Sequence, residues 1–115
     1  MFGPRRLLVA FADADGRLVS LLHAERTDPP EDALEACTMR AGQGASLAIA
    51  YCDEMLETGP PPEDLAERFE AAQRATARWG VRLVDWISCD DELFRSTWIA
   101  VHDEPPWWDL SLIHI

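Results

Sequence analysis

Residues 46–96 carry the sequence SLAIAYCDEMLETGPPPEDLAERFEAAQRATARWGVRLVDWISCDDELFRS, and this stretch decides the fold. It opens with an uninterrupted apolar run at 47–50, which is typical of a strand covered on both faces. A Pro-rich turn at 59–62 follows, and the acidic pair Glu63 and Asp64 then opens a segment of helical periodicity. A second apolar run comes after that segment. The stretch therefore predicts a strand, a helix and a second strand.

The helix is expected over residues 63–79. Its apolar side chains recur at steps of three and four residues, which places on one face Leu65, Phe69, Ala72, Ala75 or Thr76, and Trp79. Gly80 ends the helix, and residues 81–87 predict the next strand.

A last strand is expected over residues 93–101, after a turn at 90–92. Within it, Arg95 and Thr97 alternate with apolar neighbours, which is the pattern of a half-buried strand. Three tryptophans fall on predicted helix and strand positions and are expected to pack in the core or to cover the sheet: Trp79, Trp86 and Trp98.

The residues before this stretch predict a hairpin and a helix. An apolar strand at 7–11 and a return strand at 17–23 flank Asp13-Ala14-Asp15-Gly16, and Asp-Gly between two apolar runs is a strong hairpin signal. Residues 28–42 then predict a helix with Asp28 as its cap, since acidic residues and prolines fill the first turn.

The predicted order of elements is β-β-α-β-α-β-β. This order belongs to the α/β class, with helices packed on a mixed sheet. Residues 1–109 are expected to form a single domain, because this length suits one core and no repeat or linker divides the chain.

Residues 110–115, LSLIHI, are set apart from that domain. They match the in-frame translation of part of a transposon end that is used as a sequencing adapter. The alternative is a short terminal strand, because Leu-Ser-Leu-Ile has strand-like composition. We favour the adapter, expect the natural chain to continue beyond Asp109, and assign no role to His114.

The charge balance bears on the partners of the protein. The chain has 10 Lys and Arg, all of them arginine, against 21 Asp and Glu, and its formal net charge is −11. Nucleic acid is not expected as a partner, because binding a phosphate backbone needs clustered Lys or Arg. A membrane is not expected either, since no apolar run approaches the roughly 20 residues that span a bilayer.

The cysteines point to a reducing compartment. Three of them occur at wide spacing, without a C-x-x-C pair, and they are expected to be buried free thiols: Cys37, Cys52 and Cys89. Together with the lack of a signal peptide pattern, this favours a cytoplasmic protein.

The string Glu63-Asp64-Leu65, the helix, and then GVRLVDWI at residues 80–87 resemble the second half of RadC-type JAB/MPN (JAMM) metalloprotease-like domains. In that family, Ser-x-x-Asp opens the helix and a Gly-Ile-x-Val-Leu-Asp-His-like strand follows it. The resemblance covers residues 7–98 in element order, but only 51–87 in recognisable residues. It implies a JAB/MPN-like fold with the layering of cytidine deaminases.

Carried over residue by residue, the chemistry of the family is largely missing. Such domains hold zinc with two histidines and an aspartate, and use a glutamate as general base and a serine to support the oxyanion. Tyr51 and Asp53 stand in place of the two histidines, and Pro61 in place of the serine. Asp64 matches the ligand aspartate. The family's glutamate is best matched by Leu22, and the nearest acid is Glu25.

The resemblance therefore implies a degenerate member of the family, without zinc or peptidase activity. We expect a binding or regulatory module that uses the old substrate groove near Tyr51, Asp53 and Asp64. One alternative is an isopeptidase-like, metal-dependent hydrolase with altered ligands, namely Asp53, Asp64 and His23. Another is a small α/β domain unrelated to this family.

The string Pro105-Pro106-Trp107-Trp108 follows the last predicted strand. It is stiff and apolar, and we expect Trp107 and Trp108 to cap an edge of the sheet. The alternative is that they dock a partner protein. The sequence leaves the identity of that partner and the oligomeric state open.

Overall fold

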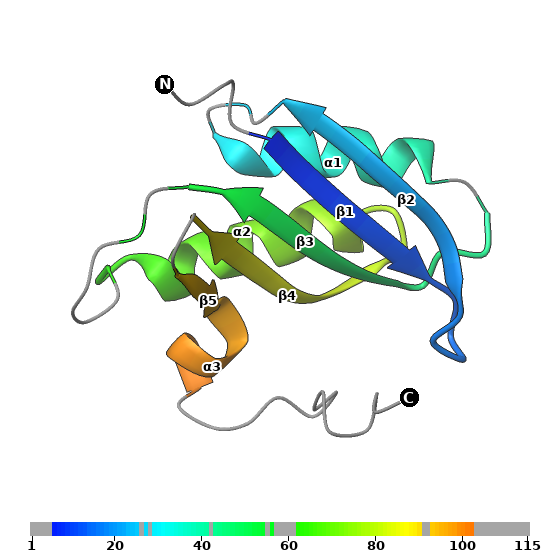
Figure 1. Ribbon diagram of the computed structural model, residues 1–115. Coiled ribbons are helices and arrows are strands. Elements are labelled where there is room, and N and C mark those ends of the chain that lie inside the picture. The colour runs from blue at the N-terminus through cyan, green and yellow to red at the C-terminus, as the bar shows by residue number, and fades with distance from the viewer. Residues whose placement is uncertain are drawn as a thin grey trace, which may run out of the picture.

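Five strands and three helices make up the part of the chain that the structure, a computed structural model, describes (Figure 1). The described residues are 6–25, 27, 29–41, 43–54, 56, 62–90 and 93–102. The elements are β1 (Arg6–Ala12), β2 (Leu18–Glu25), α1 (Pro30–Arg40), β3 (Leu47–Asp53), α2 (Leu65–Ala77), β4 (Arg82–Cys89), β5 (Phe94–Ser96) and α3 (Thr97–His102).

The strands form one mixed sheet in the order β2-β1-β3-β4-β5. β1 runs antiparallel to both β2 and β3, and β5 runs antiparallel to β4. β3 and β4 are parallel, and α2 provides the crossover that a parallel pair requires. The predicted α/β class with a mixed sheet is confirmed.

The hairpin between β1 and β2 is also confirmed. Asp13 accepts hydrogen bonds at its carboxylate from the N–H groups of Asp15 and Arg17, at 2.9 and 3.0 Å. Gly16 has a φ of 84°, a left-handed conformation that glycine adopts without a steric penalty. Hydrogen bonds to the Asp13 side chain thus hold the turn of the Asp-x-Asp-Gly string.

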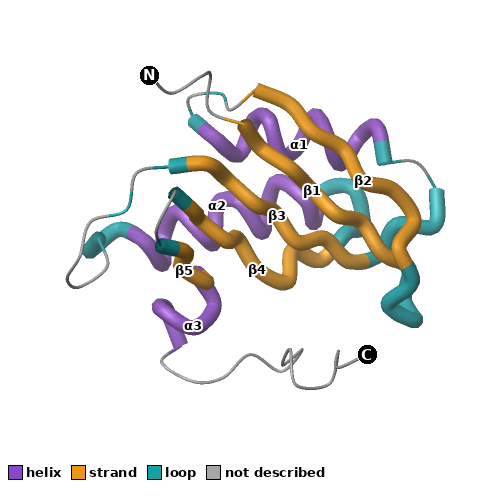
Figure 2. Tube along the Cα trace, viewed as in Figure 1, coloured by secondary structure: helices purple, strands orange, loops and turns teal. Residues whose placement is uncertain are grey.

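Both long helices cover the same face of the sheet, as Figure 2 shows. The core lies between them and alternate residues of β1 and β3, with Leu34 of α1 and Phe69 of α2 packed against Phe11, Ala50 and their neighbours. The apolar run in β3 was expected to be covered on both faces, which is correct for one face only. Its alternate residues Leu47 and Ile49 stay partly exposed because neither α1 nor α2 lies on their side.

Trp79 is not on the packing face of a helix as predicted. α2 ends at Ala77, two residues earlier than expected, and the Trp79 side chain is 49% exposed. Its indole Nε1 donates to Glu35 of α1 at 2.9 Å, and Arg78 approaches the other oxygen of the same carboxylate. Trp79 therefore joins the two helices at their surface.

The predicted last strand, 93–101, is wrong over most of its length. β5 ends at Ser96, and α3 begins at the next residue. The helix is held at its start by contacts that local alternation does not reveal. The Ser96 hydroxyl accepts the N–H of Ile99, and the Asp85 carboxylate of β4 accepts the N–H of Trp98. Trp98 is half-buried on α3, and its ring centroid is 4.0 Å from that of His102.

α3 replaces a strand at the edge of β4. β5 pairs only with residues 87–89 of that strand, and beyond this the Thr97 hydroxyl donates to the Trp86 carbonyl at 2.6 Å. The edge is therefore covered by a helix over part of its length, which protects it from pairing with another chain.

Several predictions fall on residues outside the described part of the chain. These concern Asp28, Pro61, Trp107 and Trp108, and residues 110–115. Among the described helices, none is both long enough and apolar enough to cross a membrane.

Candidate binding cavity

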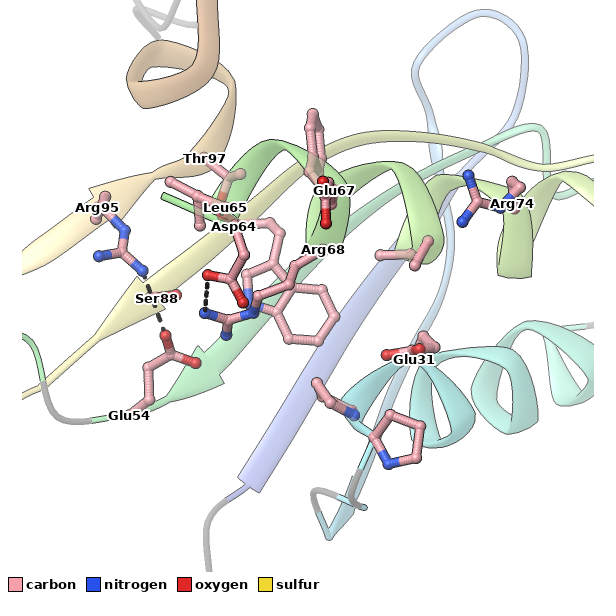
Figure 3. A pocket seen from close by; sticks show the side chains of 16 residues that line it. Glu31, Glu54, Asp64, Leu65, Glu67, Arg68, Arg74, Ser88, Arg95 and Thr97 are labelled. Atoms are coloured by element: carbon pink, nitrogen blue, oxygen red, sulfur yellow. Dashed lines mark hydrogen bonds and ion pairs between the residues drawn. The ribbon is translucent and has the colours of Figure 1, made fainter. Parts of the chain in front are cut away.

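A cavity of about 390 Å³ lies on the helix-covered face, at the carboxyl end of the parallel pair β3–β4 (Figure 3). Its walls come from the first turn of α1, the N-terminal half of α2, and the ends of β3, β4 and β5. The volume lies in the range of sites that take small ligands. The carboxyl ends of parallel strands are also where ligands commonly bind in open α/β sheets.

Apolar side chains and arginine–carboxylate pairs share the lining. Phe69, Ala72 and Trp86 supply apolar surface. Among the described residues, four acidic and three basic side chains also line the cavity: Glu31, Glu54, Asp64, Glu67, Arg68, Arg74 and Arg95. The cavity is therefore amphipathic and carries nearly balanced charge.

Of the two ion pairs described in the cavity, the one between Glu54 and Arg95 is the more buried. Their Oε1 and Nη2 atoms are 3.4 Å apart, and the two side chains are only 9% and 21% exposed (Figure 3). Glu54 leaves β3 at its end, and its N–H donates to the Cys89 carbonyl of β4 at 3.0 Å. Arg95 comes from β5, so the pair joins the outer strand to the centre of the sheet.

Asp64 is the one described member of the predicted site that lines this cavity. It stands directly before α2, is exposed, and lies 4.0 Å from Arg68 one helical turn further on. In Figure 3 its carboxylate points to that guanidinium. Its position at the start of the helix matches the prediction.

Tyr51 lies on the opposite face of the sheet. Along β3 it alternates with Ala50 and Cys52, which are fully buried in the core under the helices. Burial, followed by the neighbouring Asp85 and Cys89, raises the pKa of the Tyr51 phenol above its ordinary value. The phenol is therefore neutral at pH 7, and a neutral phenol is a poor metal ligand.

Asp53 and His23 are also outside the lining of the cavity. Asp53 ends β3, is exposed, and shares the face of Tyr51. His23 is exposed on β2, and both it and Tyr51 are paired with Leu8 of β1. Two strand spacings, roughly 9–10 Å, therefore separate the backbones of His23 and Tyr51.

The donor set that the family would use for zinc does not fit that metal here. Tyr51 and Asp53 stand on one face of the sheet, whereas Asp64 is directed into the cavity on the other and is paired with Arg68. Zinc prefers nitrogen and sulfur ligands over two carboxylates and a phenol. Within the described ranges, no three His, Cys, Asp or Glu side chains converge in a way that could hold a metal ion.

Glu54, Ser88 and Arg95 line the cavity but were missed as site residues from the sequence. Ser88 is on β4 and pairs in register with Arg95 of β5, so both point toward the helices. The sequence contained one signal that could have identified two of them, because Glu54 and Ser88 lie at the ends of two strands that a helix joins. Such strands are parallel, and their ends meet at one edge of the sheet.

The cysteines differ in their expected reactivity. Cys89 is half-buried, and burial followed by the negative charges of Asp53, Asp90 and Glu54 raises its pKa. A raised pKa lowers the thiolate fraction, so we expect Cys89 to react with iodoacetamide more slowly than in the urea-unfolded chain at the same pH. Asp53→Asn should speed this reaction, and Asp15→Asn, on the distant hairpin, should not.

Mass spectrometry of the alkylated protein checks this prediction. Cys37 and Cys52 are fully buried and should be modified only on unfolding. Modification of Cys52 at the rate of Cys89 in the folded protein would contradict the packing described for β3.

Comparison of the chain with protein-family models gives no match, and a search of curated proteins gives no significant match.

Proposed function

We propose that this chain is a degenerate RadC-like JAB/MPN domain that acts as a binding or regulatory module, with the cavity as its binding site. The residues that resemble the family, 51–87, fall on β3, α2 and β4. These three elements form the β-α-β unit whose carboxyl end borders the cavity. The mixed sheet, with its antiparallel hairpin beside this unit, is compatible with JAB-like layering.

The pairing of carboxylates with arginines carries the proposal. In a metal site, the carboxylates converge on a cation that compensates their charge. Here Glu54 is paired with Arg95, and Asp64 with Arg68. Guanidinium groups, which stay charged at any physiological pH, thus supply the positive charge that a metal would bring.

The same pairing argues against a hydrolase with altered ligands. Such an enzyme needs a metal and a base beside one another, and its candidate ligands were Asp53, Asp64 and His23. His23 stands on the far strand β2, and Asp53 lies outside the cavity. A binding module needs neither a metal nor a base, only a cavity with unused surface and hydrogen-bonding groups.

Metal content and thermal stability test the proposal together. We expect the purified protein to contain no stoichiometric zinc by elemental analysis, and its melting temperature to be the same with and without a chelator. A bound metal at 100 times its dissociation constant would add about 2.7 kcal/mol to the free energy of unfolding. For a domain of this size, each kcal/mol moves the melting temperature by roughly 4 °C, so the shift would be plain.

Asp64→Asn gives the matched control for this measurement. Without a metal, this exposed substitution should change the free energy of unfolding by less than about 0.5 kcal/mol, because it removes only an exposed ion pair. Near-stoichiometric zinc that is lost in Asp64→Asn, together with stability, would overturn the module and restore the hydrolase.

A further inference from the structure

Two buried hydrogen-bonding groups on the cavity wall have no partner within the described part of the chain. Ser88 is 1% exposed, and its Oγ atom has no hydrogen-bond partner among the described residues. The Arg95 Nε atom is buried and lacks a partner in the same way. A buried polar group without a partner costs about 1–3 kcal/mol, so such groups are uncommon unless something else satisfies them.

Both groups lie in the same small region of the cavity wall. Ser88 and Arg95 are directly opposite one another on β4 and β5, and both line the cavity. Side chains opposite one another on antiparallel strands are about 5 Å apart at their Cβ atoms. The two side chains therefore stand on the same wall of the cavity.

The charge of the cavity selects an uncharged acceptor. The Arg95 guanidinium is already paired with Glu54 at 3.4 Å, so its positive charge is compensated. A carboxylate or phosphate bound at Arg95 would stand beside the Glu54 carboxylate, and the two negative charges would repel one another in this partly buried site. An ammonium or guanidinium group has only donors and would leave the Ser88 hydroxyl and Arg95 Nε unsatisfied as donors.

We propose that the cavity binds an uncharged amide, such as a segment of peptide backbone, whose carbonyl oxygen accepts from the Ser88 hydroxyl and Arg95 Nε–H. A small apolar group next to the amide packs on Phe69, Ala72 and Trp86, which supply the apolar part of the lining. This inference rests on the proposed function, because it names the ligand class of the same cavity.

The probe for this inference is N-acetyl-leucine-N-methylamide, a leucine with both ends blocked. Titration into the ¹⁵N-labelled protein, followed by two-dimensional NMR, should shift amide signals of β4, β5 and the first half of α2. N-acetyl-leucine, which differs in having a free carboxylate, should bind more weakly. Stronger binding of the free acid would overturn the choice of an uncharged acceptor.

Ser88→Ala and Ser20→Ala form a matched pair of variants. Ser20 on β2 also has a buried hydroxyl without a described partner, but it does not line the cavity. Ser88→Ala should weaken binding of the blocked leucine by about fivefold, the value of one hydrogen bond of about 1 kcal/mol. Ser20→Ala should leave the dissociation constant unchanged. Neither variant should melt below the parent, because neither loses a protein hydrogen bond.

The possible outcomes separate this inference from the proposed function. Equal affinity of Ser88→Ala and the parent for the blocked leucine would overturn the carbonyl contact. So would a lower melting temperature of Ser88→Ala, since it would reveal a structural partner for the hydroxyl. Absence of binding to the parent protein at millimolar probe would overturn the amide ligand. The zinc measurement tests the proposed binding module itself, and that measurement does not involve Ser88.

Discussion

Replacing Asp85 by alanine is expected to lower the free energy of unfolding by about 3 kcal/mol. The carboxylate is fully buried in β4 and accepts from the N–H groups of Trp86 and Trp98 and from the Ser96 hydroxyl. Alanine would leave these buried donors without an acceptor, at about 1–3 kcal/mol for each group that stays unsatisfied. Because Trp98 is in the first turn of α3, that helix should be lost first.

Asp85→Asn is the matched control for this variant. Its carbonyl oxygen can accept from both N–H groups, and its amide can donate to the Ser96 oxygen, so that only the Ser96 O–H loses its acceptor. We expect its free energy of unfolding to stay within about 1 kcal/mol of the parent. Urea denaturation followed by circular dichroism and tryptophan fluorescence measures both variants. Equal stability of the alanine and asparagine variants would contradict the role of this carboxylate.

The difference in stability between the parent and Asp85→Asn should change with pH in a defined direction. Burial raises the pKa of Asp85 above its ordinary value of 3.8, although hydrogen bonds from Ser96, Trp98 and Trp86 oppose the rise. The folded chain therefore holds the proton more tightly than the unfolded chain. Lowering the pH through the raised pKa toward 3.8 should stabilise the parent relative to the asparagine variant, whose amide does not titrate. Paired melts between roughly pH 4 and pH 7 test this.

Phe11→Ala is expected to destabilise the protein by about 3–5 kcal/mol, the cost of truncating a buried phenylalanine. Phe11 is a fully buried residue of β1 and belongs to the core between the sheet and the helices. The substitution removes apolar contact and leaves a void that the surrounding strands and helices fill only in part.

Phe94→Ala applies the same chemical change to the same sheet, at a position of opposite exposure. Phe94 is 75% exposed on β5, so its truncation should cost less than about 0.5 kcal/mol. Urea titrations of both variants, with the slope of the transition compared, measure the difference. Similar losses at the two positions would contradict the placement of the core on the face that α1 and α2 cover.

The hairpin and the β3-α2-β4 unit could be predicted because their signals are local. Asp13 and Gly16 build their turn from groups within four residues of one another. The apolar steps of α2 bury one stripe of the helix, as the spacing of Leu65, Phe69 and Ala72 predicted. Periodicity reports which residues share a face, and one buried face is what such elements need.

The candidate site could be predicted only in part. Asp64 was expected at the start of α2 and lines the cavity there. Glu54, Ser88 and Arg95 come from three different strands, and only the register of the sheet brings them together. The expectation that β3 is covered on both faces also failed, because a run of apolar residues does not tell how many helices pack on each side.

The sequence by itself determined the α/β class, the hairpin, and the strand–helix–strand unit, because chain neighbours supply the turn chemistry and the apolar periodicity. Only the tertiary structure decided that the residues after Ser96 form α3 instead of a longer strand. The decisive hydrogen bonds join Asp85 to residues 11 and 13 positions away, on another element. A buried carboxylate needs hydrogen-bond donors around it, whichever part of the chain supplies them. Here the start of a helix supplies these donors.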